Sequence, residues 1–240
     1  MESPEFNGES HVEQADKVIF ACFENPDTLS PESKEKIDQI KKEGVNIDWH
    51  ATQGELEKRD MKHGCDDGSY AISPVDSKDK YSEGYFICLG IVAVGRNREG
   101  ENISFMSHQN PGATFVEEIE EKFSVNLAEC LTTLKEQSIE GSIDIVFLGG
   151  QYPRFDSSIT EEYYWDAYEE SMNKMRDIVF STINIEPTII TGPKTEEDAT
   201  KENETNAYFS THDRRLYVVQ DDYTLGQAGR VSDIQKIYKR

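Results

Sequence analysis

The sequence has only four cysteines in 240 residues, and no two of them form a Cys-x-x-Cys pair. Disulfide-stapled secreted domains are shorter and much denser in cysteine, so a disulfide framework is not expected. His63-x-Cys65 is the only close pair of a histidine and a cysteine, and one such pair makes a poor zinc site. This scarcity predicts a chain with neither disulfides nor a bound metal.

Positive charge is also scarce. Lysine and arginine total 25 against 47 aspartates and glutamates, which gives a formal net charge of -22. Binding to nucleic acid or to an anionic membrane requires a basic face, so neither is expected as a partner. No apolar run approaches the roughly 18 residues that a membrane-spanning helix needs. The first residues also lack the basic start and apolar core of a secretory signal, so we expect a cytoplasmic protein.

The length fits one domain, since domains hold about 100–200 residues. Residues 1–16 are polar and acidic without periodicity, which predicts a flexible tail. We expect a single domain over 17–222, with a loose acidic surface insertion at 193–205, and a C-terminal tail over 223–240. No internal repeat divides the chain.

Apolar runs of strand length alternate with longer segments whose apolar residues recur every three or four positions. The first helix carries signals at both ends: Ser30 as its N-cap, Pro31 in its first turn and Gly44 as a left-handed terminus. The pattern predicts an α+β, layered α/β fold, with a mostly antiparallel mixed sheet or sandwich and at least two long helices packed on it. The expected strands are 18–23, 45–49, 84–95, 101–108, 143–148, 188–191, 207–210 and 215–219, and the expected helices are 27–44, 114–136 and 158–181, the last with a Ser158-x-x-Glu161 capping box.

A cysteine and a histidine stand on neighbouring predicted strands. Strands 84–95 and 101–108 read as an antiparallel hairpin, and a register centred near Arg98 pairs Cys88 with His108. Directly opposed residues have Cβ atoms about 4.5–5.5 Å apart, which lets an imidazole reach a thiol and lower its pKa. A slip of one residue would put the two side chains on opposite faces.

Each member of this pair also has a purely structural interpretation. Cysteine inside an apolar strand is often a small core residue, and His108 can simply end its strand. Cys22 and Cys130 are expected in the core, because one lies in a short apolar strand and the other on the apolar stripe of a helix. His50 follows a predicted strand, but no apolar strand beside it carries a cysteine.

Together these residues resemble the chemoreceptor glutamine deamidases (the CheD family). The order is a strand with cysteine, a strand with histidine, a helix, a strand ending in Gly-Gly, a second helix and a closing hairpin. The likeness covers roughly residues 80–222 and leaves 17–79 as an N-terminal α/β extension. The matching segments are Cys88-Leu-Gly-Ile-Val-Ala-Val, Ser107-His108-Gln-Asn-Pro111, Ile145-Val-Phe-Leu-Gly-Gly150, Asn206-Ala-Tyr-Phe-Ser and Arg215-Leu-Tyr-Val-Val.

The resemblance implies the Cys-His deamidase fold that this family shares with the catalytic domains of cytotoxic necrotizing factors. It implies that Cys88 is the nucleophile and His108 the acid and base. The family's third residue is a threonine on the strand leading to the cysteine, and Ser82 stands near that place here. The implied reaction converts a glutamine side chain on a protein substrate to glutamate, without a metal or organic cofactor.

Other functions remain open at this point. The family has Gly-Ser before its nucleophile, whereas this chain has Phe86-Ile87, which favours a non-catalytic acidic module that binds a protein partner on the same fold. A thiol hydrolase acting on another amide or ester needs the same thiol and imidazole. A third alternative is an aromatic ligand platform, although such a stripe on a helix is usually core packing. That platform consists of Tyr163, Tyr164, Trp165 and Tyr168.

Overall fold

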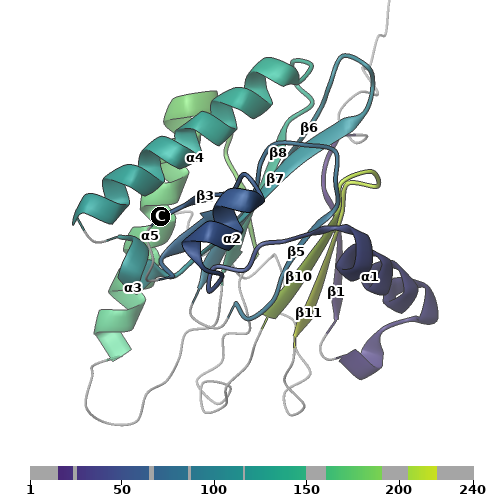
Figure 1. Cartoon of the computed structure of the whole chain (residues 1–240), viewed down its shortest axis with the longest axis horizontal. Helices are drawn as coiled ribbons and strands as arrows, with labels where there is room; N and C mark the ends of the chain where they lie inside the picture. Colours follow the sequence, from purple (N-terminus) through teal and green to yellow (C-terminus); the bar gives the residue numbers. More distant parts are fainter. Residues whose placement is uncertain are drawn as a thin grey trace, which may run out of the picture.

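The computed structural model describes residues 16–23, 26–64, 68–85, 88–115, 117–149, 161–190 and 205–220. Within these ranges two mixed β-sheets lie together, with helices on both sides (Figure 1). The expected layered α+β fold is therefore confirmed, in the form of a sandwich.

The first sheet has the strand order β1-β11-β10-β5-β2. The closing hairpin of the sequence analysis is confirmed, because β10 and β11 pair antiparallel in its centre. β1 runs parallel to β11, and β2 runs parallel to β5. The strands are β1 (Ile19–Phe23), β2 (Val45–Asn46), β5 (Lys80–Ser82), β10 (Thr205–Ser210) and β11 (Arg215–Gln220).

The second sheet has the strand order β3-β4-β7-β6-β8-β9. Its centre is the antiparallel β6–β7 pair, which confirms the predicted hairpin. β8 pairs antiparallel with β6 and parallel with β9. The strands are β3 (Lys62–His63), β4 (Tyr70–Ile72), β6 (Leu89–Arg96), β7 (Asn102–Gln109), β8 (Asp144–Gly149) and β9 (Thr188–Ile190).

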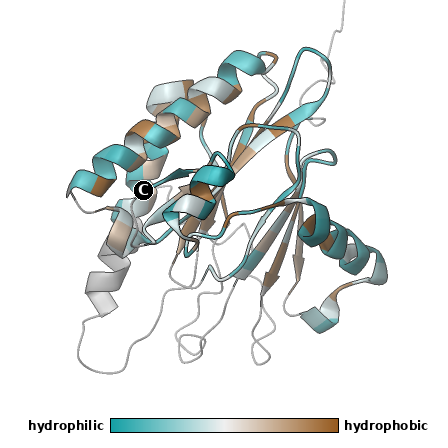
Figure 2. Ribbon diagram, in the orientation of Figure 1, coloured by the Kyte–Doolittle hydropathy of each residue, from teal (hydrophilic) through white to brown (hydrophobic). Residues whose placement is uncertain are grey.

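Three apolar layers hold the fold together. One lies between the sheets, where Val92 and Val94 of β6 meet Phe209 of β10. The helices α4 (Glu117–Gln137) and α5 (Glu161–Ile183) cover the outer face of the second sheet, and α1 (Pro31–Glu43) covers the first sheet. Figure 2 shows that the strands are largely apolar while α1 and α4 carry many hydrophilic residues. β6 is buried on both faces, which explains its unbroken apolar sequence.

Local signals position α1 well. Ser30 is the N-cap, and its hydroxyl accepts a hydrogen bond from the Ser33 amide at 3.1 Å. The helix begins at Pro31, later than expected, because Pro26–Thr28 forms a separate 3-10 turn, η1. Gly44 ends the helix in an extended conformation, with φ -82°, so the left-handed terminus was wrong. Glycine is required here for steric reasons, because a Cβ at this position would lie 2.6 Å from the Ile40 carbonyl oxygen.

Several other expectations need correction. Strand 45–49 shortens to β2, and the helix expected from Thr114 divides into α3 (Pro111–Thr114) and α4. Cys130 is buried as predicted, but Cys22 is exposed, because β1 is an edge strand with one neighbour. The polar region 51–82 contains α2 (Gln53–Lys58) and three short strands that its composition did not reveal.

Some of the predicted features lie outside the described residues. These are Cys65, the Ser158 end of the expected capping box and the acidic insertion apart from Thr205. The side chains of the proposed aromatic platform, residues 163–168, also lie outside what the structure describes.

Candidate functional site

His108 lies on β7 with its side chain in the layer between the sheets, and it is fully buried. Its Nδ1 is 2.7 Å from the Ser82 hydroxyl, which comes from β5 of the other sheet. Ser82 donates its own hydrogen to the carbonyl oxygen of Ile47 at 2.6 Å. Nδ1 must therefore carry a proton and donate it to Ser82, which leaves the Nε2 lone pair available as a base.

No described residue hydrogen-bonds to His108 Nε2, although the atom is buried. Most buried polar atoms have a partner, and leaving one bare costs about 1–3 kcal/mol. Nε2 can therefore accept a hydrogen bond from a group that enters the site. Ser82, which the family resemblance placed near the third site residue, thus contacts His108 directly.

Two aromatic rings enclose the imidazole. Tyr85 stacks on it with ring centroids 4.1 Å apart and an interplanar angle of 13°. Trp49 approaches with its ring centroid at 5.5 Å and also lies against the exposed His50 ring, at 3.7 Å. The Tyr85 hydroxyl donates a hydrogen bond to the carbonyl oxygen of Ser107 at 2.9 Å, which fixes the ring in place.

Gly90 provides the space for Tyr85. A Cβ at this position would lie 2.7 Å from Tyr85 Cε1 and 2.7 Å from the Ser107 carbonyl oxygen. Such distances are shorter than side-chain carbons tolerate, so only glycine lets the ring lie against β6. A glycine within an otherwise apolar strand was the only sequence signal of this close approach.

Cys88 precedes β6 directly and is 3% exposed. Its expected pairing with His108 is wrong, because the hairpin is centred on Glu99 and places Leu89 opposite Gln109. His108 therefore stands level with Gly90. The loop is displaced because the Asn97 amide bonds to the Glu101 carbonyl oxygen at 2.8 Å.

A displacement of two residues in pairing preserves the face of each side chain. Cys88 is accordingly packed in the same inter-sheet layer as Tyr85, whose ring covers His108. Cys88 and His108 share this layer without a hydrogen bond between them, since no described residue bonds to Nε2.

Burial keeps both groups neutral. Desolvation raises the pKa of the Cys88 thiol to about 12. Desolvation, followed by the charge of nearby His50, holds the pKa of His108 well below its ordinary value. The expected lowering of the cysteine pKa is therefore absent in this arrangement, in which the thiol and the imidazole are each neutral.

Other candidate sites receive little support. Among the described residues, no group of three or more His, Cys, Asp or Glu side chains is placed to hold a metal ion. His63 instead lies with Nε2 4.0 Å from a Glu57 carboxylate oxygen. No helix in the described ranges is long and apolar enough to cross a membrane.

Comparison with known proteins adds no assignment. The sequence matches no family model, and no curated protein is significantly similar to it. The function must therefore be argued from Cys88, His108, Ser82 and the rings around them.

Proposed function

We propose that this chain is a CheD-like cysteine hydrolase that deamidates glutamine side chains of a protein substrate. The observation that carries the proposal is the Ser82–His108 hydrogen bond of 2.7 Å, which orients a buried Nε2 that has no partner among the described residues, in the layer that holds Cys88. Ser82 and Ile47 fix the tautomer of the imidazole, as a nucleophile–base pair requires.

The chemistry uses only these groups. His108 Nε2 takes the proton of the Cys88 thiol, and the sulfur forms a bond to the carboxamide carbon of glutamine. The carbon–nitrogen bond then breaks, and the imidazolium returns its proton to the departing ammonia. Nε2 next activates a water molecule, whose oxygen displaces the sulfur and leaves glutamate and the free thiol.

The reaction requires the site to open. Cys88 and His108 are buried, so a glutamine side chain reaches them only when an enclosing ring moves. Trp49 is half-buried and follows the short strand β2, whereas Tyr85 is fully buried and tied to Ser107. Trp49 is therefore expected to move more easily than Tyr85, because it is less buried. Once the site opens, the sulfur and Nε2 can meet, which activates the thiol.

Short unstructured peptides that contain glutamine test the reaction, with asparagine peptides as the control. The wild-type chain is expected to convert glutamine to glutamate, read by mass spectrometry, with release of ammonia. Cys88→Ser and His108→Gln are expected to abolish the conversion, and Trp49→Ala to increase it by opening the site.

Two outcomes would contradict deamidation. One is conversion that Cys88→Ser leaves unchanged, since the sulfur would then have no role. The other is hydrolysis of esters or thioesters by the wild-type chain with glutamine untouched, which would assign the same groups to another thiol hydrolase.

A second function is favoured by the burial of Cys88 and its high thiol pKa. A cysteine that is 3% exposed is also consistent with an ordinary core residue. The chain would then be an acidic module that binds a protein partner, and its net charge of -22 would favour a basic or neutral surface on that partner.

A further inference from the structure

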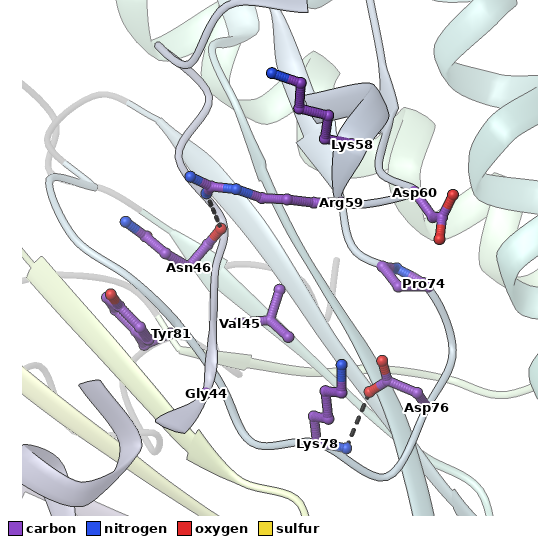
Figure 3. Close-up of a pocket in the computed structure, with 10 residues that line it drawn as sticks. All are labelled: Gly44, Val45, Asn46, Lys58, Arg59, Asp60, Pro74, Asp76, Lys78 and Tyr81. Carbon is purple, nitrogen blue, oxygen red and sulfur yellow. Dashed lines mark hydrogen bonds between the residues drawn. The ribbon is translucent and has the colours of Figure 1, made fainter. Parts of the chain in front are cut away.

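A polar cleft lies between β2, the end of α2 and the segment that joins β4 to β5 (Figure 3). Its volume is about 670 Å³, within the range of about 300–1,000 Å³ that small-molecule sites occupy. In Figure 3, Arg59 crosses one side of the cleft toward Asn46, and the Lys78 side chain rises from the other side.

Among the described residues, the cationic groups of this cleft form no ion pair at contact distance, although Lys58 and Arg59 lie in the field of the Glu55 carboxylate. Arg59 Nη1 donates one long hydrogen bond, of 3.4 Å, to the carbonyl oxygen of Asn46. Within the described part of the chain, the Lys58 and Lys78 ammonium groups have neither a hydrogen bond nor an ion pair. In a chain with a net charge of -22, three cations in one cleft without a contact ion pair form a local excess of positive charge.

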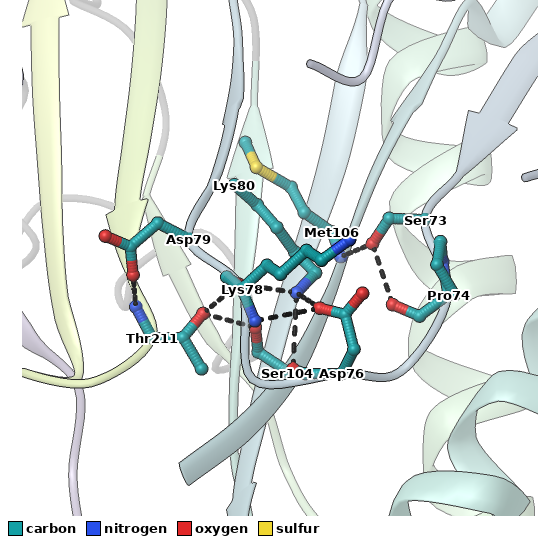
Figure 4. Close-up of polar contacts among 9 residues, drawn as sticks. All are labelled: Ser73, Pro74, Asp76, Lys78, Asp79, Lys80, Ser104, Met106 and Thr211. Atoms are coloured by element: carbon teal, nitrogen blue, oxygen red, sulfur yellow. Dashed lines mark hydrogen bonds and ion pairs between the residues drawn. The ribbon is translucent and has the colours of Figure 1, made fainter. Parts of the chain in front are cut away.

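The carboxylate of Asp76 is already neutralised from the other side. Lys80 is fully buried, and its ammonium contacts Asp76 Oδ1 and the Lys78 carbonyl oxygen, both at 2.8 Å (Figure 4). Asp76 Oδ1 also accepts the Lys78 amide at 3.0 Å. Among the described residues that line the cleft, Asp60 is then the one remaining carboxylate, against the cations Lys58, Arg59 and Lys78.

We propose that this cleft binds a small ligand through a phosphate group. The excess of positive charge in the cleft favours a ligand that carries more than one negative charge. A guanidinium offers a planar fork that matches phosphate oxygens, and a lysine adds a mobile point charge. The ligand is a small molecule rather than a nucleic acid, since the cationic region is confined to one cleft of a strongly acidic chain.

The site is separate from the proposed catalytic groups. Asn46 and Tyr81 line the cleft, whereas the Ser82 hydroxyl bonds to His108 and to the Ile47 carbonyl oxygen. Phosphate binding does not depend on Cys88 chemistry, so the two proposals can fail independently.

Titration calorimetry at low salt with inorganic pyrophosphate tests the proposal on the full chain. Saturable binding is expected, and Arg59→Gln/Lys78→Gln is expected to weaken it by at least about tenfold, the effect of losing one charge-assisted hydrogen bond. The matched control is Lys34→Gln/Arg98→Gln, which removes the same charge from exposed positions elsewhere and should leave the affinity unchanged.

Three results would overturn the proposal. Absence of saturable pyrophosphate binding is one. Equal weakening in the two double variants is another, because the binding would then reflect overall charge. Succinate binding as tightly as pyrophosphate is the third, because the cleft would then recognise carboxylates. All the substituted side chains are exposed, and equal thermal midpoints will show that both variants fold.

Discussion

Replacing Gly90 with alanine should destabilise the protein and disturb the His108 site together. The added Cβ meets a backbone oxygen and a buried aromatic carbon, each at 2.7 Å. Neither neighbour is the free end of a flexible side chain, so β6 or Tyr85 must move. Overpacking of this kind costs about 1–3 kcal/mol, and the backbone contact favours the upper end. At about 2–4 °C per kcal/mol for a chain of this size, the thermal midpoint should fall by about 6–12 °C.

Gly54→Ala is the matched control, because a Cβ there meets nothing within 4 Å. This glycine lies in α2, where alanine should raise the free energy of unfolding by about 0.5–1 kcal/mol. Urea unfolding measures both variants, and near-ultraviolet circular dichroism reports whether Tyr85 has moved. A Gly90→Ala variant within about 0.5 kcal/mol of wild type, with an unchanged spectrum, would refute the close approach described above.

Three further substitutions probe the buried polar groups. Ser82→Ala removes the hydroxyl that bonds to the Ile47 carbonyl oxygen and to His108, and it should lower the free energy of unfolding in urea by about 2–4 kcal/mol. Ser82→Thr keeps a hydroxyl and should cost less. Equal losses in the two variants would exclude these hydrogen bonds as the cause. The lowered pKa of His108 contributes stability that is present above the unfolded pKa near 6.5 and is lost as pH falls. The free energy of unfolding, measured between pH 8 and 5, should therefore fall more steeply in the wild type than in His108→Gln, by up to about 1.4 kcal/mol per pH unit. Equal slopes in the two chains would contradict a buried neutral imidazole. Lys80→Met leaves Asp76 without its cation and should destabilise the chain by about 1–3 kcal/mol. The double variant Asp76→Ala/Lys80→Met should recover part of this loss, because it leaves no unpaired carboxylate. No recovery would show that the ion pair is not responsible.

Signals within one element predicted that element well. Ser30 and Pro31 marked the start of α1, and apolar runs of strand length separated by turn residues gave the β6–β7 and β10–β11 hairpins. The register of β6–β7 was missed because side-chain and backbone bonds of Asn97 move the loop by one residue.

Contacts between the sheets had no local signal. β5 reads as a polar loop because two of its three residues are a lysine and a serine. Both are buried with partners distant in space, Lys80 with Asp76 and Ser82 with His108. Ser82 was named from the family resemblance, since alternation of apolar residues carried no information about it. The cleft was missed for the same reason, because separate elements supply its cations.

The central claim is that His108 activates Cys88, and Cys130 provides an internal standard for testing it. The two cysteines are 3% and 5% exposed, and burial raises their pKa values to about 12 and about 11. Burial alone therefore predicts that Cys88 reacts no faster than Cys130.

The most direct measurement is the rate of iodoacetamide labelling at each cysteine between pH 6 and 9, resolved by peptide mass spectrometry, in wild type and His108→Gln. We expect Cys88 to be labelled faster than Cys130 at neutral pH in the wild-type chain, and this advantage to disappear in the variant. Labelling of Cys88 that is no faster than that of Cys130, and indifferent to His108, would contradict the account and leave Cys88 a core residue.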